Sequence, residues 1–99
     1  MSFTLTRRRM ESGREVSNAD RAEWAGKAVH AFAFMTHMDT SGDLEHDKPT
    51  VIGDLIADLI HYCDQEKIDF EDVLARGRDH YKEELAEEEE LKREGLISS

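Results

Sequence analysis

The segment VIGDLIADLIHYC, residues 51–63, is the feature that most constrains the fold, because its apolar and polar residues follow the period of an α-helix. Six apolar residues share one side of such a helix: Ile52, Leu55, Ile56, Leu59, Ile60 and Cys63. At about 100° per residue, Asp54, Asp58 and His61 fall together on the opposite side. The pattern predicts an amphipathic helix over residues 51–66 whose apolar side faces the core.

A second helical pattern begins at Ser17 or Asn18, either of which is a good N-cap, and runs to about Met38. Eight apolar residues fill a wide arc of this helix: Trp24, Ala25, Ala28, Val29, Ala31, Phe32, Met35 and Met38. An arc this wide indicates contact with more than one neighbour. We therefore expect the chain to self-associate through this first helix.

A turn-rich connection, residues 39–50, leads to the helix over 51–66, for which Thr50 is the expected cap. Asp69 is the expected cap of a third helix, whose apolar residues are Phe70, Val73, Leu74, Tyr81 and Leu85. The apolar pattern stops after Leu85, because Glu88 stands where the next core residue belongs. We expect the helix to continue, exposed to solvent, until Gly95 ends it.

These patterns predict an all-α fold, a three-helix bundle-like domain completed by homo-oligomerisation. A chain of 99 residues buries a small core, so a second copy is a natural source of stability. Residues 1–16 are polar and basic and are expected to form a flexible arm. Residues 17–99 are expected to form a single helical domain with a solvated, acidic C-terminal helix end.

The net charge of −10 argues against broad binding to a nucleic-acid backbone and favours a basic or nucleic-acid-binding protein as partner. Arg7–Arg9 leave arm-mediated binding of nucleic acid open as a third possibility, to which we give less weight. The acidic run of Glu87, Glu88, Glu89 and Glu90 is a candidate imitation of a phosphate backbone, and Phe34 is a candidate apolar anchor.

Cys63 is the only cysteine, so no disulfide forms within the chain, and a reducing, cytoplasmic setting is expected. No segment approaches the ~20 apolar residues that span a bilayer, so no membrane contact is expected. There is also no Gly-x-Ser-x-Gly elbow and no glycine-rich phosphate loop. We assign no catalytic residue and expect no cofactor, and a non-enzyme is favoured.

The polar side of the helix over 51–66 is the candidate binding face, formed by Asp54, Asp58, His61 and Gln65. Carboxylate oxygens at that spacing are suitable ligands for a hard divalent cation, with Asp54 and Asp58 as the metal ligands. The same face lies opposite the apolar side, where an amphipathic helix normally meets solvent. A purely solvated face is therefore the simpler interpretation.

The segment GDLIADLIHYCDQEKIDFEDVLARGRDHY, residues 53–81, resembles the later half of the all-α, MazG-like nucleoside triphosphate pyrophosphohydrolases. Members of that family are oligomeric helical bundles that hold magnesium with acidic residues. The resemblance implies that Asp54 takes the place of the Asp in the family's Glu-x-x-Asp motif. The Glu of that motif falls on Val51, and the preceding helix offers only Asp20 and Glu23 for the family's Glu-Glu-x-x-Glu motif.

The leading hypothesis is a small acidic helical protein that binds another macromolecule. By analogy, it is an accessory protein of a phage or mobile element that inhibits a host nuclease or defence complex. The alternative is a divergent magnesium-dependent nucleotide pyrophosphohydrolase or nucleotide-binding protein of MazG-like fold. In that alternative Asp54 binds the metal, Asp58 or His61 is a second ligand or base, and Arg78 or His80 contacts phosphate.

Overall fold

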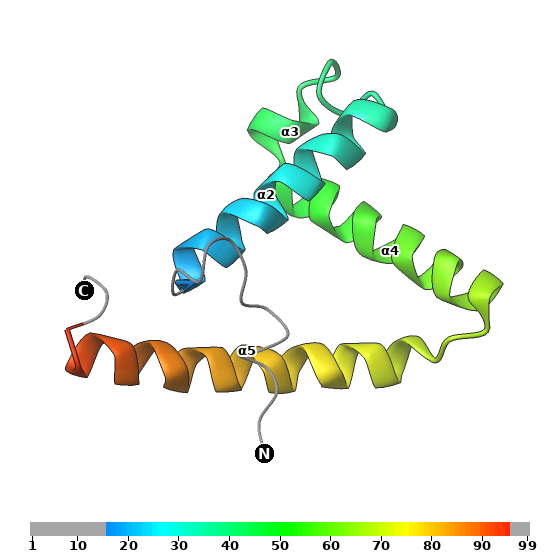
Figure 1. Cartoon of the computed structure of the whole chain (residues 1–99). Coiled ribbons are helices and arrows are strands. Elements are labelled where there is room, and N and C mark those ends of the chain that lie inside the picture. The colour runs from blue at the N-terminus through cyan, green and yellow to red at the C-terminus, as the bar shows by residue number, and fades with distance from the viewer. Residues whose placement is uncertain (1–15, 96–99) are drawn as a thin grey trace. The chain divides into compact units, whose positions relative to one another are not determined.

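The computed structural model describes residues 16–95, and this part of the chain contains helices and no strand (Figure 1). Helices account for 81% of the described residues, so the fold class is all-α, as predicted. The helices are α2 (Asn18–Met35), α3 (Asp43–His46), α4 (Lys48–Glu66) and α5 (Phe70–Arg93). Apart from Val16, the predicted basic arm lies outside the described residues.

Packing divides the described residues into two compact units. One unit holds residues 23–71, which include most of α2 and all of α3 and α4. The other holds residues 16–22 and 72–95, which include the first turn of α2 and most of α5. Each unit has its own packing and is described separately below.

Helix α2 begins with a reciprocal capping box at Ser17, one of the two N-caps that the sequence offers. The Asp20 backbone N–H donates to Ser17 Oγ at 3.2 Å, and the Ser17 N–H donates to Asp20 Oδ2 at 3.0 Å. Both bonds satisfy donors that a helix N-terminus would otherwise leave without partners. The start of the first helix could therefore be read directly from the sequence.

Helix α2 ends at Met35, one turn earlier than expected, because His37 adopts the left-handed conformation with φ 64°. The N–H of Met38 donates to the carbonyl of Ala33 at 2.8 Å, and the N–H of His37 donates to the carbonyl of Phe34 at 3.3 Å. This is the hydrogen-bond pattern of a Schellman motif. Since no glycine marks the position, the early end was not evident from the sequence.

The predicted cap and start of α4 are wrong by about one turn. Asp47, and not Thr50, is the N-cap: its side chain accepts from the Thr50 N–H at 3.3 Å and from the Thr50 hydroxyl at 2.8 Å. Pro49 lies in the first turn, where its missing N–H costs nothing. The connection before α4 also contains a short helix, α3, where the sequence predicted only turns.

The predicted end of α4 at Glu66 is confirmed, and a second Schellman motif makes it. Lys67 is left-handed with φ 61°, and the Ile68 N–H donates to the Cys63 carbonyl at 2.8 Å. The boundaries of α5 also follow the prediction: Asp69 accepts from the Glu71 N–H at 3.0 Å, and Gly95, with φ 77°, follows the last turn.

The core of the unit formed by residues 23–71 is small. Phe32, Ala33 and Val51 are buried there, with Ala33 and Val51 fully enclosed. Four half-buried apolar residues pack against them: Val29, Met38, Leu44 and Leu55. The apolar arc expected on α2 is thus only partly inside, since Ala25, Ala28, Ala31 and Met35 remain exposed.

The expected orientation of α4 is only partly correct, since two of the six residues of its predicted core side are inside: Leu55 packs against the core and Cys63 is buried. Val51 and Leu55 face the core, whereas four members of the predicted core side are 39–44% exposed: Ile52, Ile56, Leu59 and Ile60. Val51 and Leu55 centre about 90° around the helix from the middle of the predicted apolar side, so the core contacts are displaced toward its Leu55 edge. Within the unit formed by residues 23–71, much of the most apolar side of α4 is therefore exposed.

Among the described helices, none has both the length and the hydropathy that crossing a bilayer requires.

Candidate functional site

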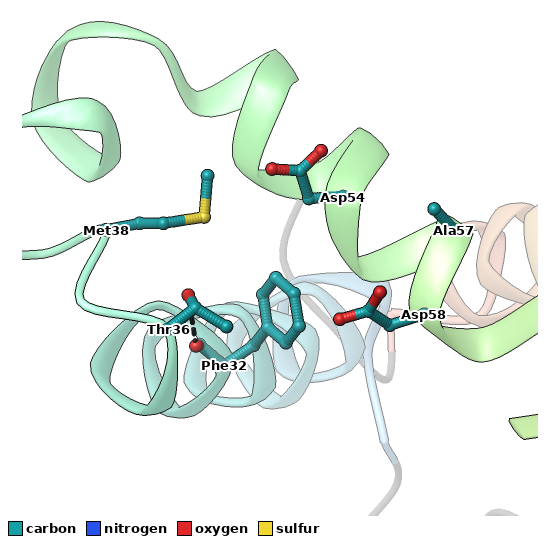
Figure 2. A pocket seen from close by; sticks show the side chains of 6 residues that line it. All are labelled: Phe32, Thr36, Met38, Asp54, Ala57 and Asp58. Atoms are coloured by element: carbon teal, nitrogen blue, oxygen red, sulfur yellow. Dashed lines mark hydrogen bonds between the residues drawn. The ribbon is translucent and has the colours of Figure 1, made fainter. Parts of the chain in front are cut away.

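Two residues of the predicted binding face, Asp54 and Asp58, line a pocket in the unit formed by residues 23–71 (Figure 2). The pocket has a volume of about 360 Å³. Its lining comes from α4, from α2 and from the turn that follows α2: Asp54, Ala57, Asp58, Phe32, Thr36 and Met38. The orientation of α4 that buries Val51 also places the side chains of Asp54 and Asp58 beside α2.

The early end of α2 shapes the opposite side of the pocket. Phe32 is 7% exposed and belongs to the core, so its ring is a fixed apolar surface of the pocket. Thr36 Oγ1 donates to the Phe32 carbonyl at 2.9 Å, which fixes the Thr36 side chain. Met38 follows the left-handed His37 and packs against the core beside these residues.

The other two residues of the predicted face, His61 and Gln65, do not line the pocket. Both side chains are exposed. They lie one and two helical turns beyond Asp58, or about 4.5 and 10.5 Å along the helix axis. The structure therefore brings together the two carboxylates of the predicted set and leaves the imidazole and the amide outside.

Two carboxylates beside an apolar surface suit an ammonium or guanidinium group on an aliphatic stem. The charged head would donate hydrogen bonds to the carboxylates of Asp54 and Asp58, while the stem packs on Phe32 and Met38. Two carboxylates can also hold Mg²⁺ when water and substrate phosphate oxygens complete its six ligands. Within residues 16–95, no three His, Cys, Asp or Glu side chains come together in a way that would hold a metal ion.

Val51 stands where the resemblance to the MazG-like enzymes places a Glu, and it is fully buried against Phe32 and Ala33. The position is therefore a core position, and a carboxylate there would be removed from water. Of the family's Glu-x-x-Asp motif, this part of α4 therefore supplies only Asp54.

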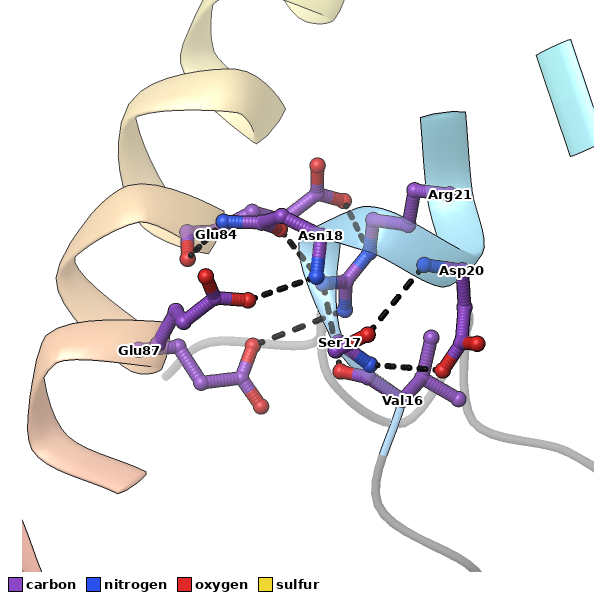
Figure 3. A network of polar contacts seen from close by, with 8 residues as sticks. Val16, Ser17, Asn18, Asp20, Arg21, Glu84 and Glu87 are labelled. Carbon is purple, nitrogen blue, oxygen red and sulfur yellow. Dashed lines mark hydrogen bonds and ion pairs between the residues drawn. The ribbon is translucent and has the colours of Figure 1, made fainter. Parts of the chain in front are cut away.

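The other unit contains a buried polar network around Arg21, which ties the start of α2 to α5 (Figure 3). Arg21 is 8% exposed and Glu84 7%. The Arg21 Nε lies 3.3 Å from Glu84 Oε2, and a second guanidinium nitrogen lies 3.7 Å from Glu87 Oε1. The guanidinium also donates to the Val16 carbonyl at 3.3 Å and to Asn18 Oδ1 at 2.7 Å.

Asn18 makes two more links between α2 and α5. Its backbone N–H donates to Glu88 Oε1 at 2.6 Å, and its side-chain amide donates to the Glu84 carbonyl at 3.2 Å. One signal for this network was present in the sequence, because Glu88 stands where the apolar side of α5 should continue. Its partner, Asn18, lies 70 residues earlier in the chain and could not be identified.

The acidic run, a predicted interaction surface, is divided by this network. Glu87 is half-buried and pairs with Arg21, and Glu88 is half-buried and pairs with Lys92 at 3.7 Å. Glu89 and Glu90 are exposed, and Glu90 pairs with Arg93. Half of the run is therefore engaged in the packing of its own unit.

A more continuous acidic surface runs along the exposed side of α5. Asp79, Glu83, Glu90 and Glu94 are all exposed, and their spacing of four, seven and four residues places them on one side of the helix. We call these four residues the acidic stripe. The stripe extends over residues 79–94, or about 22 Å. Phe34, the predicted apolar anchor, belongs to the unit formed by residues 23–71 and is 71% exposed.

No family model matches the sequence, and no curated protein or solved structure shows significant similarity to it. The resemblance of residues 53–81 to MazG-like enzymes therefore stays a prediction.

Proposed function

We propose that this protein is a small acidic helical protein that works by binding a basic surface of another protein. The acidic stripe carries the proposal. Its four exposed carboxylates, of which Glu90 pairs with Arg93, form a linear array of negative charge along α5 and the residue that follows it. Such an array attracts lysine and arginine side chains and accelerates encounter. We take the partner to be a protein whose surface normally binds nucleic acid.

The biological setting that we propose is a phage or mobile element whose host carries the partner, a nuclease or defence complex. This proposal rests on the small size, the acidity and the helical content of the chain. Phe34 supports it as a candidate anchor, because exposed aromatic side chains often dominate the binding energy of protein interfaces. The single cysteine, Cys63, is a free thiol and supports a cytoplasmic location.

We also propose that self-association completes the three-helix, bundle-like arrangement. The support is the apolar side of α4, which the unit formed by residues 23–71 leaves exposed at four large residues. A core of three buried residues is small for an independent domain, and a second copy would enlarge it.

Affinity capture from the native host tests partner binding, with three forms of the protein as bait. The first is the wild type, and the second carries Asp79→Asn, Glu83→Gln and Glu94→Gln in the acidic stripe. The third is a matched control with the same loss of charge at three exposed residues of the other unit, Asp39→Asn, Glu45→Gln and Glu71→Gln. We expect a basic protein with the first and third baits and its loss with the second. Equal recovery with all three would contradict the proposal.

The pocket supports a second candidate, a magnesium-dependent nucleotide pyrophosphohydrolase, because Asp54 and Asp58 line it together. In this candidate, water and substrate phosphate oxygens would complete the magnesium shell to which the two carboxylates contribute. The test is pyrophosphate release from a panel of nucleoside triphosphates with magnesium, together with the magnesium-dependent shift in melting temperature. The variant Asp54→Asn/Asp58→Asn is the control, and a shift or a turnover that this variant retains would exclude these residues as the site.

A further inference from the structure

The exposed apolar side of α4, formed by Ile52, Ile56, Leu59 and Ile60, is the starting point. These residues span about 80 to 100° of the helix and run for more than two turns. No charged residue interrupts them, since Asp54, Asp58 and His61 lie on the far side of α4. An apolar side of this kind can pack against another apolar helix. The charged residues at the two ends of α4 indicate which helix that is.

The first and last residues of α4 are Lys48 and Glu66. They are 18 residues apart, which is about five full turns, so they lie on the same side of the helix and border the same edge of the apolar face. Both are exposed, and within residues 16–95 neither takes part in an ion pair. Opposite charges therefore stand at opposite ends of one edge.

These two charges are placed against the helix dipole. The N-terminus of a helix favours an anion and the C-terminus a cation, yet α4 begins with Lys48 and ends with Glu66. Within a single chain this placement is unfavourable at both ends. An intermolecular partner for each charge would offset it.

We infer that a second copy of this chain covers the face, with the two α4 helices antiparallel about a two-fold axis. In such a pair the same edge of each helix faces its counterpart in the other copy. The N-terminal end of one helix then lies beside the C-terminal end of the other. Lys48 of each copy then lies beside Glu66 of the other, which gives two ion pairs at the rims of an apolar centre. A parallel pair would instead place like ends together, Lys48 with Lys48 and Glu66 with Glu66.

The inference deepens the proposed self-association and is independent of binding to a basic partner. The test is the dimerisation constant of the full chain, measured by sedimentation at concentrations from about 1 μM to 1 mM. Four variants are compared with the wild type: Ile56→Asp, Lys48→Glu, Glu66→Lys and the double exchange Lys48→Glu/Glu66→Lys. Circular dichroism checks that each variant keeps its helix content.

We expect Ile56→Asp to abolish the dimer and each single charge reversal to weaken it about tenfold, because two attractive pairs become two repulsive ones. The double exchange restores both pairs and is expected to regain the wild-type constant. Each single reversal also improves the match with the helix dipole, so the melting temperature of the dilute monomer should rise while the dimer weakens. A variant that simply folds less well would instead lower both its melting temperature and the strength of its dimer.

A wild-type chain that stays monomeric throughout would overturn both the self-association and the antiparallel pair. A dimer that is indifferent to Lys48→Glu and to Glu66→Lys, or one that the double exchange fails to restore, would overturn the antiparallel pair alone.

Discussion

Arg21 and Glu84 form a buried ion pair, with Nε and Oε2 3.3 Å apart and each residue less than a tenth exposed. The pair joins the start of α2 to α5, 63 residues later in the sequence. Arg21 also reaches Glu87 and two acceptors near the N-terminus of α2. This guanidinium is therefore the centre of the polar packing in its unit.

Arg21→Ala is expected to lower the free energy of unfolding by about 3 kcal/mol, because it leaves the buried Glu84 carboxylate without its main cation. The double variant Arg21→Met/Glu84→Leu removes both charges and keeps similar volumes, and it should cost much less. Urea unfolding of the three proteins measures the difference. A double variant as unstable as Arg21→Ala would show that the buried charges themselves are not the cause.

The turned orientation of α4 predicts that two adjacent residues have unequal weight in stability. Val51→Ala, at a fully buried position, should cost about 2 kcal/mol. Ile52→Ala, at a position that is 44% exposed, should cost about 1 kcal/mol or less in a dilute sample. Chemical denaturation at low concentration checks both. The opposite order would restore the orientation that the apolar side of α4 predicts.

The start of α4 predicts a similar contrast between two polar residues. Asp47→Ala removes the side chain that caps the helix and should cost about 1 kcal/mol. Thr50→Ala removes only a hydroxyl that donates to Asp47, and an exposed bond of this kind is worth about 0.5 kcal/mol. Thermal unfolding of both variants is the measurement, and a larger loss for Thr50→Ala would place the cap at Thr50.

Lys67 holds a left-handed conformation that glycine adopts without strain. Lys67→Gly should therefore raise the free energy of unfolding by about 1 kcal/mol. Lys67→Ala is the matched control, because it removes the same charge but keeps the Cβ atom that causes the strain. If both variants have the same stability, strain at Lys67 does not limit the stability of the fold.

Much of the secondary structure was predictable because its signals are local. The apolar periodicity located the three long helices, and Ser17, Asp69 and Gly95 marked ends that the structure confirms. The early end of α2 was not predictable, since His37 takes a conformation that the sequence normally assigns to glycine. Local sequence signals therefore predict the positions of the helices better than the residues at which the helices end.

The orientation of α4 and the Arg21 network depend on partners far away in the chain. A helical wheel shows which side of α4 is most apolar, but the fit between Val51 and Phe32 decides which side is buried. The same packing places Asp54 in the lining of a pocket, whereas the helical wheel predicted that Asp54 faces solvent. Glu88 ends the apolar pattern of α5, and the physical reason is the bond that it accepts from the N–H of Asn18, 70 residues earlier.

The affinity of the captured partner for the acidic stripe tests the account most directly. The dissociation constant is measured by calorimetry for the wild type, for the stripe variant with Asp79→Asn, Glu83→Gln and Glu94→Gln, and for the matched control. We expect the stripe variant to bind at least about tenfold more weakly and to lose most of the salt dependence, because three of its four stripe charges are gone. The control should bind like the wild type. Equal constants for the stripe variant and the wild type would contradict the proposed function.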